Sequence, residues 1–154
     1  MKKPDAREVK YPRLRVSAII IEDERILLVR HEKYGRSYWV LPGGGMDFGE
    51  TLEEATVREL KEETNLDITV DKLVFVDDIL PRDLHRHVVD VYFTANVVGG
   101  DLEVGEDSHM HEVRFFPLEE LRDLQFEPNI ADRIIEAHKQ GFPNSADYLG
   151  NVWE

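Results

Sequence analysis

The chain has 154 residues, a formal net charge of −13 and no cysteine. This length suits one domain, which would bury roughly 70% of its unfolded surface, so we expect a single domain over residues 1–154. Without cysteine, disulfides, thiolate zinc sites and a cysteine nucleophile are excluded, which fits a reducing, cytoplasmic setting. The acidic balance disfavours nucleic-acid and anionic-lipid partners. No apolar run approaches the ~20 residues of a membrane helix, and the first residues lack the apolar segment of a secretory signal.

The first forty-five residues predict short strands. Residues 14–21 are rich in Val and Ile and predict a buried strand, with residues 26–29 as its hairpin partner after a polar turn. The charged residues 30–37 include a glycine and predict a loop. A third strand over residues 39–41 ends at Pro42 and three glycines.

A helix follows with clear signals at both ends. Thr51 is the expected N-cap, and Glu54 stands three residues later, where it can complete a capping box. The helix should end near Thr64, with Asn65 in the left-handed conformation that asparagine tolerates.

The second half predicts a sheet followed by helices. Strands are expected at residues 66–70, 73–76 (an extension or a second strand), 88–98 and 112–116, and helices at 118–124 and 130–139. The tail at 142–154 has no clear pattern. The order β-β-β-α-β-β-β-α-α predicts an α+β fold in which a mixed β-sheet is sandwiched between α-helices.

Three carboxylates on the first helix carry the chemistry. Glu59, Glu62 and Glu63 stand at i, i+3 and i+4, so they share one face about 5–6 Å apart. Such close like charges repel unless a hard cation neutralises them, and Mg²⁺ or Mn²⁺ with substrate phosphates is the natural choice. Arg58 can brace one carboxylate. Taken alone, however, Glu62 and Glu63 favour the solvated face of a surface helix, because glutamate is a good helix former.

The full spacing decides between these interpretations. Residues 44–66, GGMDFGETLEEATVRELKEETNL, resemble the Nudix box, G-x5-E-x7-R-E-U-x-E-E-x-G-U, where U is a bulky aliphatic residue. The matching positions are Gly44, Glu50, Arg58, Glu59, Leu60, Glu62, Glu63 and Leu66. Asn65 departs from the second glycine of the box, which affects helix termination and leaves the chemistry intact. The resemblance covers about residues 13–140, the expected core of a Nudix fold.

The resemblance implies a hydrolase that cleaves the pyrophosphate bond of a nucleoside diphosphate linked to a further group X. Glu59, Glu62, Glu63 and the Gly44 carbonyl would bind Mg²⁺, with Mn²⁺ as a substitute. The cation would neutralise phosphate charge and activate a water. Arg58 would orient Glu62 or Glu63, which also serve catalysis, and Glu50 would brace the loop.

A general base is expected in the loop before the last strand, where some relatives place a glutamate. Glu106 is the candidate, although backward alignment from Val113 puts His109 at that position. His109 and His111 could be metal ligands or plain surface residues.

The substrate is less clear from the sequence. Pro81 lies 16 residues after Asn65 and resembles the ADP-ribose pyrophosphatase group, which favours ADP-ribose or another nucleotide sugar; a lone proline also ends strands. Nucleoside triphosphates are the alternative. The candidate phosphate contacts are Arg30, Arg36, Arg82 and Arg86, and the candidate stacking rings are Tyr34, Trp39 and Phe48.

Two other classes compete with an enzyme. One is a Nudix-fold module that only senses a nucleotide, although such modules usually lose box carboxylates. The other is a structural metal-binding protein, which the absence of an EF-hand pattern disfavours. The resemblance also suggests a homodimer, because small Nudix pyrophosphatases often share substrate contacts across an interface.

Overall fold

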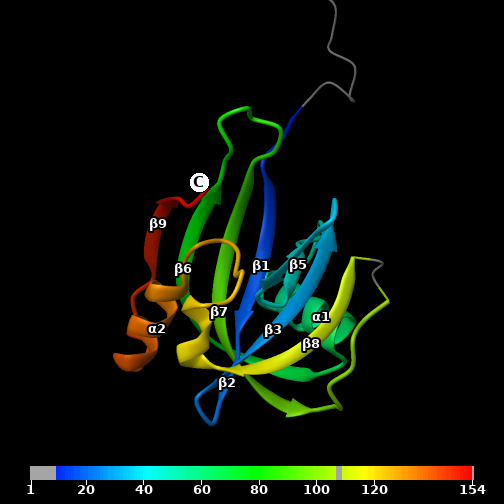
Figure 1. Ribbon diagram of the computed structural model, residues 1–154, viewed down its shortest axis with the longest axis vertical. Helices are drawn as coiled ribbons and strands as arrows, with labels where there is room; N and C mark the ends of the chain where they lie inside the picture. The colour runs from blue at the N-terminus through cyan, green and yellow to red at the C-terminus, as the bar shows by residue number, and fades with distance from the viewer. Residues whose placement is uncertain (1–9, 107–108, 154) are drawn as a thin grey trace, which may run out of the picture.

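A computed structural model describes residues 10–106 and 109–153 of the chain. Figure 1 shows two β-sheets with one helix on either side of them. The elements in chain order are β1 (Arg13–Ile19), β2 (Ile21–Glu22), β3 (Arg25–Lys33), β4 (Arg36–Val40), β5 (Gly43–Gly45), α1 (Leu52–Thr64), β6 (Asp67–Ile79), β7 (Val88–Gly99), β8 (Met110–Pro117), the 3₁₀ helix η1 (Leu118–Arg122), α2 (Ala131–Lys139) and β9 (Asp147–Asn151).

The larger sheet is mixed, with the strand order β5-β1-β7-β6-β9. Strand β1 lies parallel to β7 and antiparallel to β5, so Val16 faces Val91 on one side and Gly44 on the other. Strands β6 and β7 form a long antiparallel pair, and β9 lies parallel to β6. The glycine strand β5 and the C-terminal strand β9 are therefore the two edges of this sheet.

The smaller sheet is antiparallel and has β3 at its centre. Strand β8 pairs along one side of β3, while β2 and β4 pair with its two ends on the other side. The two sheets are continuous in the chain through the β1–β2 and β4–β5 connections, which bring the glycine strand next to β1.

Alternation along the strands fills a core on each side. In β1, Ile19 belongs to a cluster that includes Ile134 of α2, whereas Ala18 belongs to a second cluster that includes Leu60 of α1. Successive strand residues point to opposite faces, so the strands here are buried on both sides between the helices. The predicted α+β class, with a mixed sheet between helices, is confirmed.

Helix α1 has the predicted ends. The Thr51 hydroxyl accepts a hydrogen bond from the Glu54 amide at 3.1 Å, and the Glu54 carboxylate accepts one from the Thr51 amide at 3.4 Å. Asn65 ends the helix with φ 62°, the left-handed conformation. Neither this helix nor α2, the α-helices of the described residues, is long and apolar enough to cross a membrane.

The predicted loop at residues 30–37 is wrong. Strands β3 and β4 continue through it and pair from Val29–Val40 to Lys33–Arg36. Only Tyr34 and Gly35 turn the chain, with φ values of 52° and 75°. A two-residue hairpin loop with a type I′ turn needs positive φ at both central residues. The charged residues therefore belong to an exposed hairpin.

Three other elements differ from the prediction in extent. Strand β6 is continuous from residue 67 to residue 79, so the two predicted segments form one strand. The helix expected at residues 118–124 is a 3₁₀ helix of five residues. The unassigned tail contains β9, which completes the edge of the larger sheet.

Candidate active site

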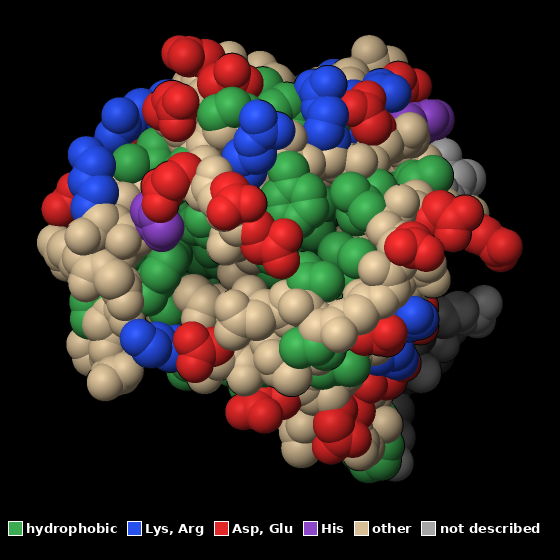
Figure 2. Space-filling model, turned by 90° about the horizontal axis from the view of Figure 1, so that it is seen from below, with side chains coloured by type: hydrophobic (Ala, Val, Ile, Leu, Met, Phe, Trp, Pro, Cys, Tyr) green, Lys and Arg blue, Asp and Glu red, His purple; other side chains and the backbone are tan. Residues whose placement is uncertain are grey.

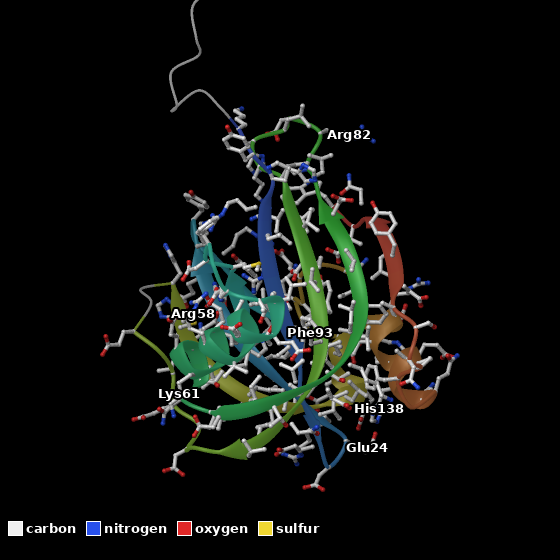
Figure 3. The ribbon with its side chains drawn as sticks, turned by 180° about the vertical axis from the view of Figure 1, so that it is seen from behind. Glu24, Arg58, Lys61, Arg82, Phe93 and His138 are labelled. Carbon is white, nitrogen blue, oxygen red and sulfur yellow. The ribbon has the colours of Figure 1, made fainter. Side chains whose placement is uncertain are left out.

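Arg58 is the centre of a carboxylate cluster on α1, and it is labelled in Figure 3. Its Nε and Nη2 atoms donate to both oxygens of Glu50 at 3.0 and 2.7 Å. Its Nη1 donates to Glu59 at 2.9 Å and to Glu62 at 3.2 Å. Its Nη2 also donates to the Gly45 carbonyl at 3.0 Å. One guanidinium thus fixes carboxylates from the loop and from two turns of the helix.

The charges of this cluster follow from its contacts. Hydrogen bonds from Arg58 and from the Asp47 amide lower the pKa of Glu50 to about 2. The same carboxylates raise the pKa of Arg58 above its usual value. Burial raises the pKa of Glu59, against the opposing effect of Arg58. Arg58 and Glu50 therefore stay ionised throughout the neutral range.

The glycine strand approaches these carboxylates more closely than any other residue type would allow. A Cβ atom on Gly44 would lie 2.3 Å from Oε2 of Glu59, and one on Gly43 would lie 2.0 Å from the Val16 carbonyl oxygen. The Gly43 amide donates to the buried Glu63 carboxylate at 3.4 Å. The glycines are needed here because side chains would collide with a strand on one side and a carboxylate on the other.

The donor set suits a hard divalent cation. Within the described ranges, no three His, Asp or Glu side chains already form a metal cage, because Glu59 and Glu62 bind Arg58 instead. Mg²⁺ does not need such a cage: one or two carboxylates suffice, with water and substrate phosphate oxygens completing its octahedron. The box carboxylates fit this requirement, as does the backbone of Gly44, which carries no side chain and lies against the Glu59 carboxylate.

The loop before β8 packs against the end of α1. The Glu103 amide donates to the Thr64 carbonyl at 2.9 Å, and the Gly105 amide donates to the Glu63 carbonyl at 3.0 Å. A Cβ atom on Gly105 would lie 2.3 Å from the Glu62 carbonyl oxygen. The next residue, Glu106, is exposed. Asp107 and Ser108 lie outside the described residues.

A cavity of about 810 Å³ opens beside the box, and Gly45 is part of its wall. This volume is typical of small-molecule sites. Its basic lining residues are Arg13, Arg15, Lys33, Arg36 and Arg86, while Asp90 and Glu127 are its acidic ones. Since the chain as a whole carries −13, this concentration of cations favours an anionic ligand. The face in Figure 2 shows acidic, basic and apolar side chains intermixed.

The sequence-family model of the NUDIX domain matches residues 11–137 of the chain. The chain belongs to the Nudix family. This Nudix hydrolase is 38% identical over 131 residues to an ADP-ribose pyrophosphatase of Methanocaldococcus jannaschii, covering 82% of the chain and 76% of that protein. It is 28% identical to an NAD-capped RNA hydrolase, NudC, of Vibrio atlanticus over 86% of the chain, but spans only 48% of that longer protein. The crystal structure of an ADP-ribose pyrophosphatase from Streptococcus suis superposes with a TM-score of 0.70 at 25% identity, covering 92% of this chain and all of that one.

The family match confirms the predicted enzyme class, a hydrolase of nucleotide-linked pyrophosphate bonds. Nudix hydrolases work with a divalent metal, as the predicted site requires. The departure at Asn65 is explained by its left-handed conformation, which supplies the geometry that glycine has in the box.

The predicted substrate contacts separate into two groups. Arg36 and Arg86 line the cavity of this Nudix hydrolase. The others are not among the described residues of its wall: Arg30 pairs with Glu32 and Glu112, Trp39 packs edge-on against Phe116, the Phe48 side chain is fully exposed, and Arg82 lies in the exposed β6–β7 loop. Figure 3 shows Arg82 at the top of the view, well above Arg58.

The remaining loop candidates lie around a smaller depression. Tyr34, His109 and His111 line it, at the turn of the β3–β4 hairpin. His111 lies 3.7 Å from Glu32, and the His109 carbonyl accepts a hydrogen bond from the Glu32 amide at 2.9 Å. His109 also reaches the wall of the larger cavity. Pro81 is buried at the end of β6.

A largely buried polar cluster at the wall of the cavity was not predicted. Ser17 donates to Asp90 at 2.9 Å, Arg15 lies 3.5 Å from the same carboxylate, and the Tyr92 hydroxyl donates to Asp77 at 2.8 Å. Burial raises the pKa of Asp90 to about 7 and that of Asp77 to about 6. One sign of this cluster was present in the sequence, because the carboxylate of Asp90 interrupts the apolar run of β7.

Proposed function

We propose that this Nudix hydrolase is a Mg²⁺-dependent pyrophosphatase of ADP-ribose or a similar nucleotide sugar. The observation that supports this substrate best is the 38% identity to an ADP-ribose pyrophosphatase, extending over 82% of the chain. A basic cavity beside the box carboxylates supports a diphosphate ligand independently. The reaction would add one water across the P–O–P linkage, giving AMP and ribose 5-phosphate.

The box residues divide the work. Glu59, Glu62, Glu63 and the Gly44 carbonyl would hold the cation, since they are the oxygen donors gathered between α1 and β5. When bound, Mg²⁺ neutralises phosphate charge and makes a bound water more acidic. Arg58 and Glu50 would act by positioning: the bidentate pair between them fixes the guanidinium that contacts Glu59 and Glu62.

Glu106 is our candidate for the general base. Its loop is attached to the end of α1 through the Gly105 amide, so its backbone is tied to Glu63. Its exposed carboxylate is free to approach a water at the box, where proton transfer would occur. Glu62 and Glu63 are the other carboxylates that could accept this proton.

The cavity would orient the substrate. Arg36 and Arg86 are our candidates for contacts to phosphate or ribose oxygens, because both line the cavity. Arg36 also pairs with Glu127, which holds its guanidinium at the cavity wall. We retain Arg30, Trp39, Phe48 and Arg82 only as contacts that would require the substrate to extend beyond this cavity.

The test is a substrate panel of ADP-ribose, other nucleotide sugars, dinucleoside polyphosphates and nucleoside triphosphates, each with Mg²⁺, with Mn²⁺ and with chelator. We expect ADP-ribose to give AMP and ribose 5-phosphate with the highest kcat/KM, and no turnover with chelator. Preferred release of pyrophosphate from a triphosphate would keep the enzyme class and reject this substrate. Binding without turnover of any member would indicate a sensing module.

We also propose that residues 1–154 act as one domain in a homodimer in a reducing, cytoplasmic setting, without nucleic-acid partners. The absence of cysteine and the charge of −13 support this setting and these partners. Light scattering measures the mass directly: a value near twice 17.9 kDa would support the dimer, and a monomer mass would reject it. Binding of duplex DNA or RNA at moderate salt would contradict the expected partners.

A further inference from the structure

The C-terminal tail lies beyond the family match, which ends at residue 137, yet it is tied firmly to the larger sheet. The Asn151 side chain donates to the Leu80 carbonyl at 2.8 Å and accepts from the Leu80 amide at 3.1 Å. The Val152 amide donates to the Asp78 carbonyl at 2.9 Å, and the Tyr148 hydroxyl donates to the Asp78 carboxylate. These bonds fix the residues that follow β9, which Figure 1 shows beside the end of β6.

These anchors place the indole of Trp153 at the cavity. Val152 and Trp153 both line it. The Arg86 guanidinium lies over the indole, 5.3 Å from the ring centre, and the His85 ring meets it edge-on at 5.7 Å. Trp153 nevertheless remains 40% exposed. A large apolar ring is thus braced by Arg86 and His85 in the wall of the cavity and remains partly exposed there.

The cavity crosses the larger sheet from edge to edge. Gly45 of β5 forms part of its wall at one edge, and Trp153 follows β9 at the other. Four strand spacings separate these edges, roughly 19 Å at the usual spacing within a sheet. The cavity can therefore take a ligand with an anionic centre near the box and a planar, apolar group some distance away. A nucleoside diphosphate has this layout.

We propose that Trp153, braced by Arg86, is a substrate-binding residue that stacks on the nucleobase of the substrate. This inference rests on the proposed function, and it identifies which part of the chain holds the base. An open indole face offers dispersion and quadrupole contacts to any planar base. Arg86 keeps the ring in place through a cation–π contact. Base recognition would then come from the tail, and hydrolysis from the box.

Fluorescence can test this binding without turnover, because Trp39 and Trp153 are the two tryptophans of the chain. Trp39→Phe leaves Trp153 as the reporter, and Trp153→Phe leaves Trp39 as the matched control. Each is titrated with AMP and with ribose 5-phosphate in chelator, with absorbance corrected against free tryptophan amide. We expect AMP to quench Trp153 and ribose 5-phosphate to leave it unchanged. Quenching by AMP only through Trp39 would overturn the inference, as would equal quenching by both ligands.

Kinetics provide a second readout. Trp153→Ala should raise the KM for ADP-ribose about 5- to 150-fold, the range expected for loss of one base–aromatic stack, and leave kcat unchanged. Trp153→Phe should raise it less, because a ring remains. Tyr11→Ala is a matched control, since Tyr11 is an exposed ring that is not among the described cavity residues. Its KM should equal that of the wild type.

The failures of the two proposals are distinguishable. If the wild type hydrolyses ADP-ribose but Trp153→Ala keeps its KM, this inference is wrong while the proposed function stands. If the wild type prefers another nucleotide, the AMP titration still reports whether Trp153 contacts a base. Circular dichroism of each variant identifies a folding defect, and in that case Trp153→Phe decides the outcome.

Discussion

Two groups of carboxylates in this Nudix hydrolase differ in their surroundings. The helix cluster consists of Glu59, Glu62 and Glu63 of α1 with Glu50 of the preceding loop, and the sheet cluster consists of Asp77 of β6 and Asp90 of β7. Glu50, Glu59 and Glu62 share the guanidinium of Arg58. Asp77 and Asp90 face each other in the register of β6 and β7, and Asp77 is fully buried with one carboxylate oxygen lacking a hydrogen bond. Both groups are carboxylates, but the first contacts a guanidinium and the second is buried within the sheet.

Their pKa values diverge for that reason. Arg58 lowers the pKa of Glu50 to about 2, whereas burial raises those of Asp77 and Asp90 to about 6 and about 7. A neighbour of opposite charge favours the ionised form, and a low-dielectric surrounding disfavours it. Glu50 therefore stays ionised at neutral pH and keeps its bidentate pair with Arg58. The sheet cluster retains protons up to that range and serves hydrogen bonding within the core.

The largest effect is expected from the helix cluster. Glu62→Gln or Glu63→Gln should each lower kcat by at least ~10²-fold, because each removes a charge from the cation and base machinery while keeping the side-chain shape. Steady-state turnover of ADP-ribose measures this. Glu53→Gln, on the first turn of the same helix, is the matched control and should retain wild-type kcat. Near wild-type turnover in both box variants would contradict the assignment of the active site.

A smaller loss is expected when the helix cluster keeps its charge but loses its geometry. Arg58→Lys removes the bidentate pair to Glu50 and leaves Glu59 and Glu62 less constrained, so the apparent Mg²⁺ affinity should fall about 10- to 100-fold. Titration of activity with Mg²⁺ measures this shift. Lys61→Gln, on the exposed side of α1, should leave the Mg²⁺ dependence unchanged, and an equal shift in both variants would refute the positioning role.

The sheet cluster should affect stability instead. Between pH ~4 and ~6 the folded state keeps a proton on Asp77 that the unfolded chain releases, so its contribution to the free energy of unfolding declines as pH rises. Asp77→Asn should match the wild type at pH 4 and exceed its stability at pH 7 by an amount on the order of 2 kcal/mol. Asp90, with a pKa of about 7, should continue the decline to neutral pH in both proteins.

Urea unfolding from pH 4 to pH 8 measures this slope. Asp71→Asn is the control, because Asp71 is exposed and should leave the slope as it is. The assigned environment of Asp77 would be contradicted by one result. In that result, the free energy of unfolding of the wild type rises over pH 4–6, and that of Asp77→Asn rises with the same slope.

The smallest effect separates helix stability from both clusters. Thr51→Ala removes the hydroxyl that caps α1 and should lower the free energy of unfolding by ~1 kcal/mol at every pH. Thr51→Ser keeps the hydroxyl and should stay near the wild type. A pH-dependent loss would mean that the cap acts through the carboxylates instead of through the helix backbone.

The helix cluster could be predicted from sequence because its geometry is local. Thr51, Glu54 and Asn65 define the helix, and the helical spacing then fixes Arg58 and its partners. The hairpin at residues 30–37 was missed because its charged residues mask a turn confined to Tyr34 and Gly35. A turn of two residues leaves little signal within a polar strand.

The sheet cluster and the tail depend on contacts between distant segments. Asp77 and Asp90 meet only through a register between β6 and β7 that shifts three times before Phe75. Strand β9 is polar and short, and it is defined by its pairing with β6. Trp153 therefore reaches the cavity through tertiary structure, and no spacing in the sequence indicates it.

Asn65 has a consequence beyond ending the helix. Its side-chain amide donates to the Asp101 carbonyl at 2.9 Å, and a Cβ atom on Gly100 would lie 2.3 Å from the Asn65 carbonyl oxygen. Glycine at position 65 would give the same backbone turn but no such side-chain bond. Asn65 therefore adds one hydrogen bond between the end of α1 and the segment that leads to β8. A change that looks like a departure from the family pattern thus ties this segment to the helix.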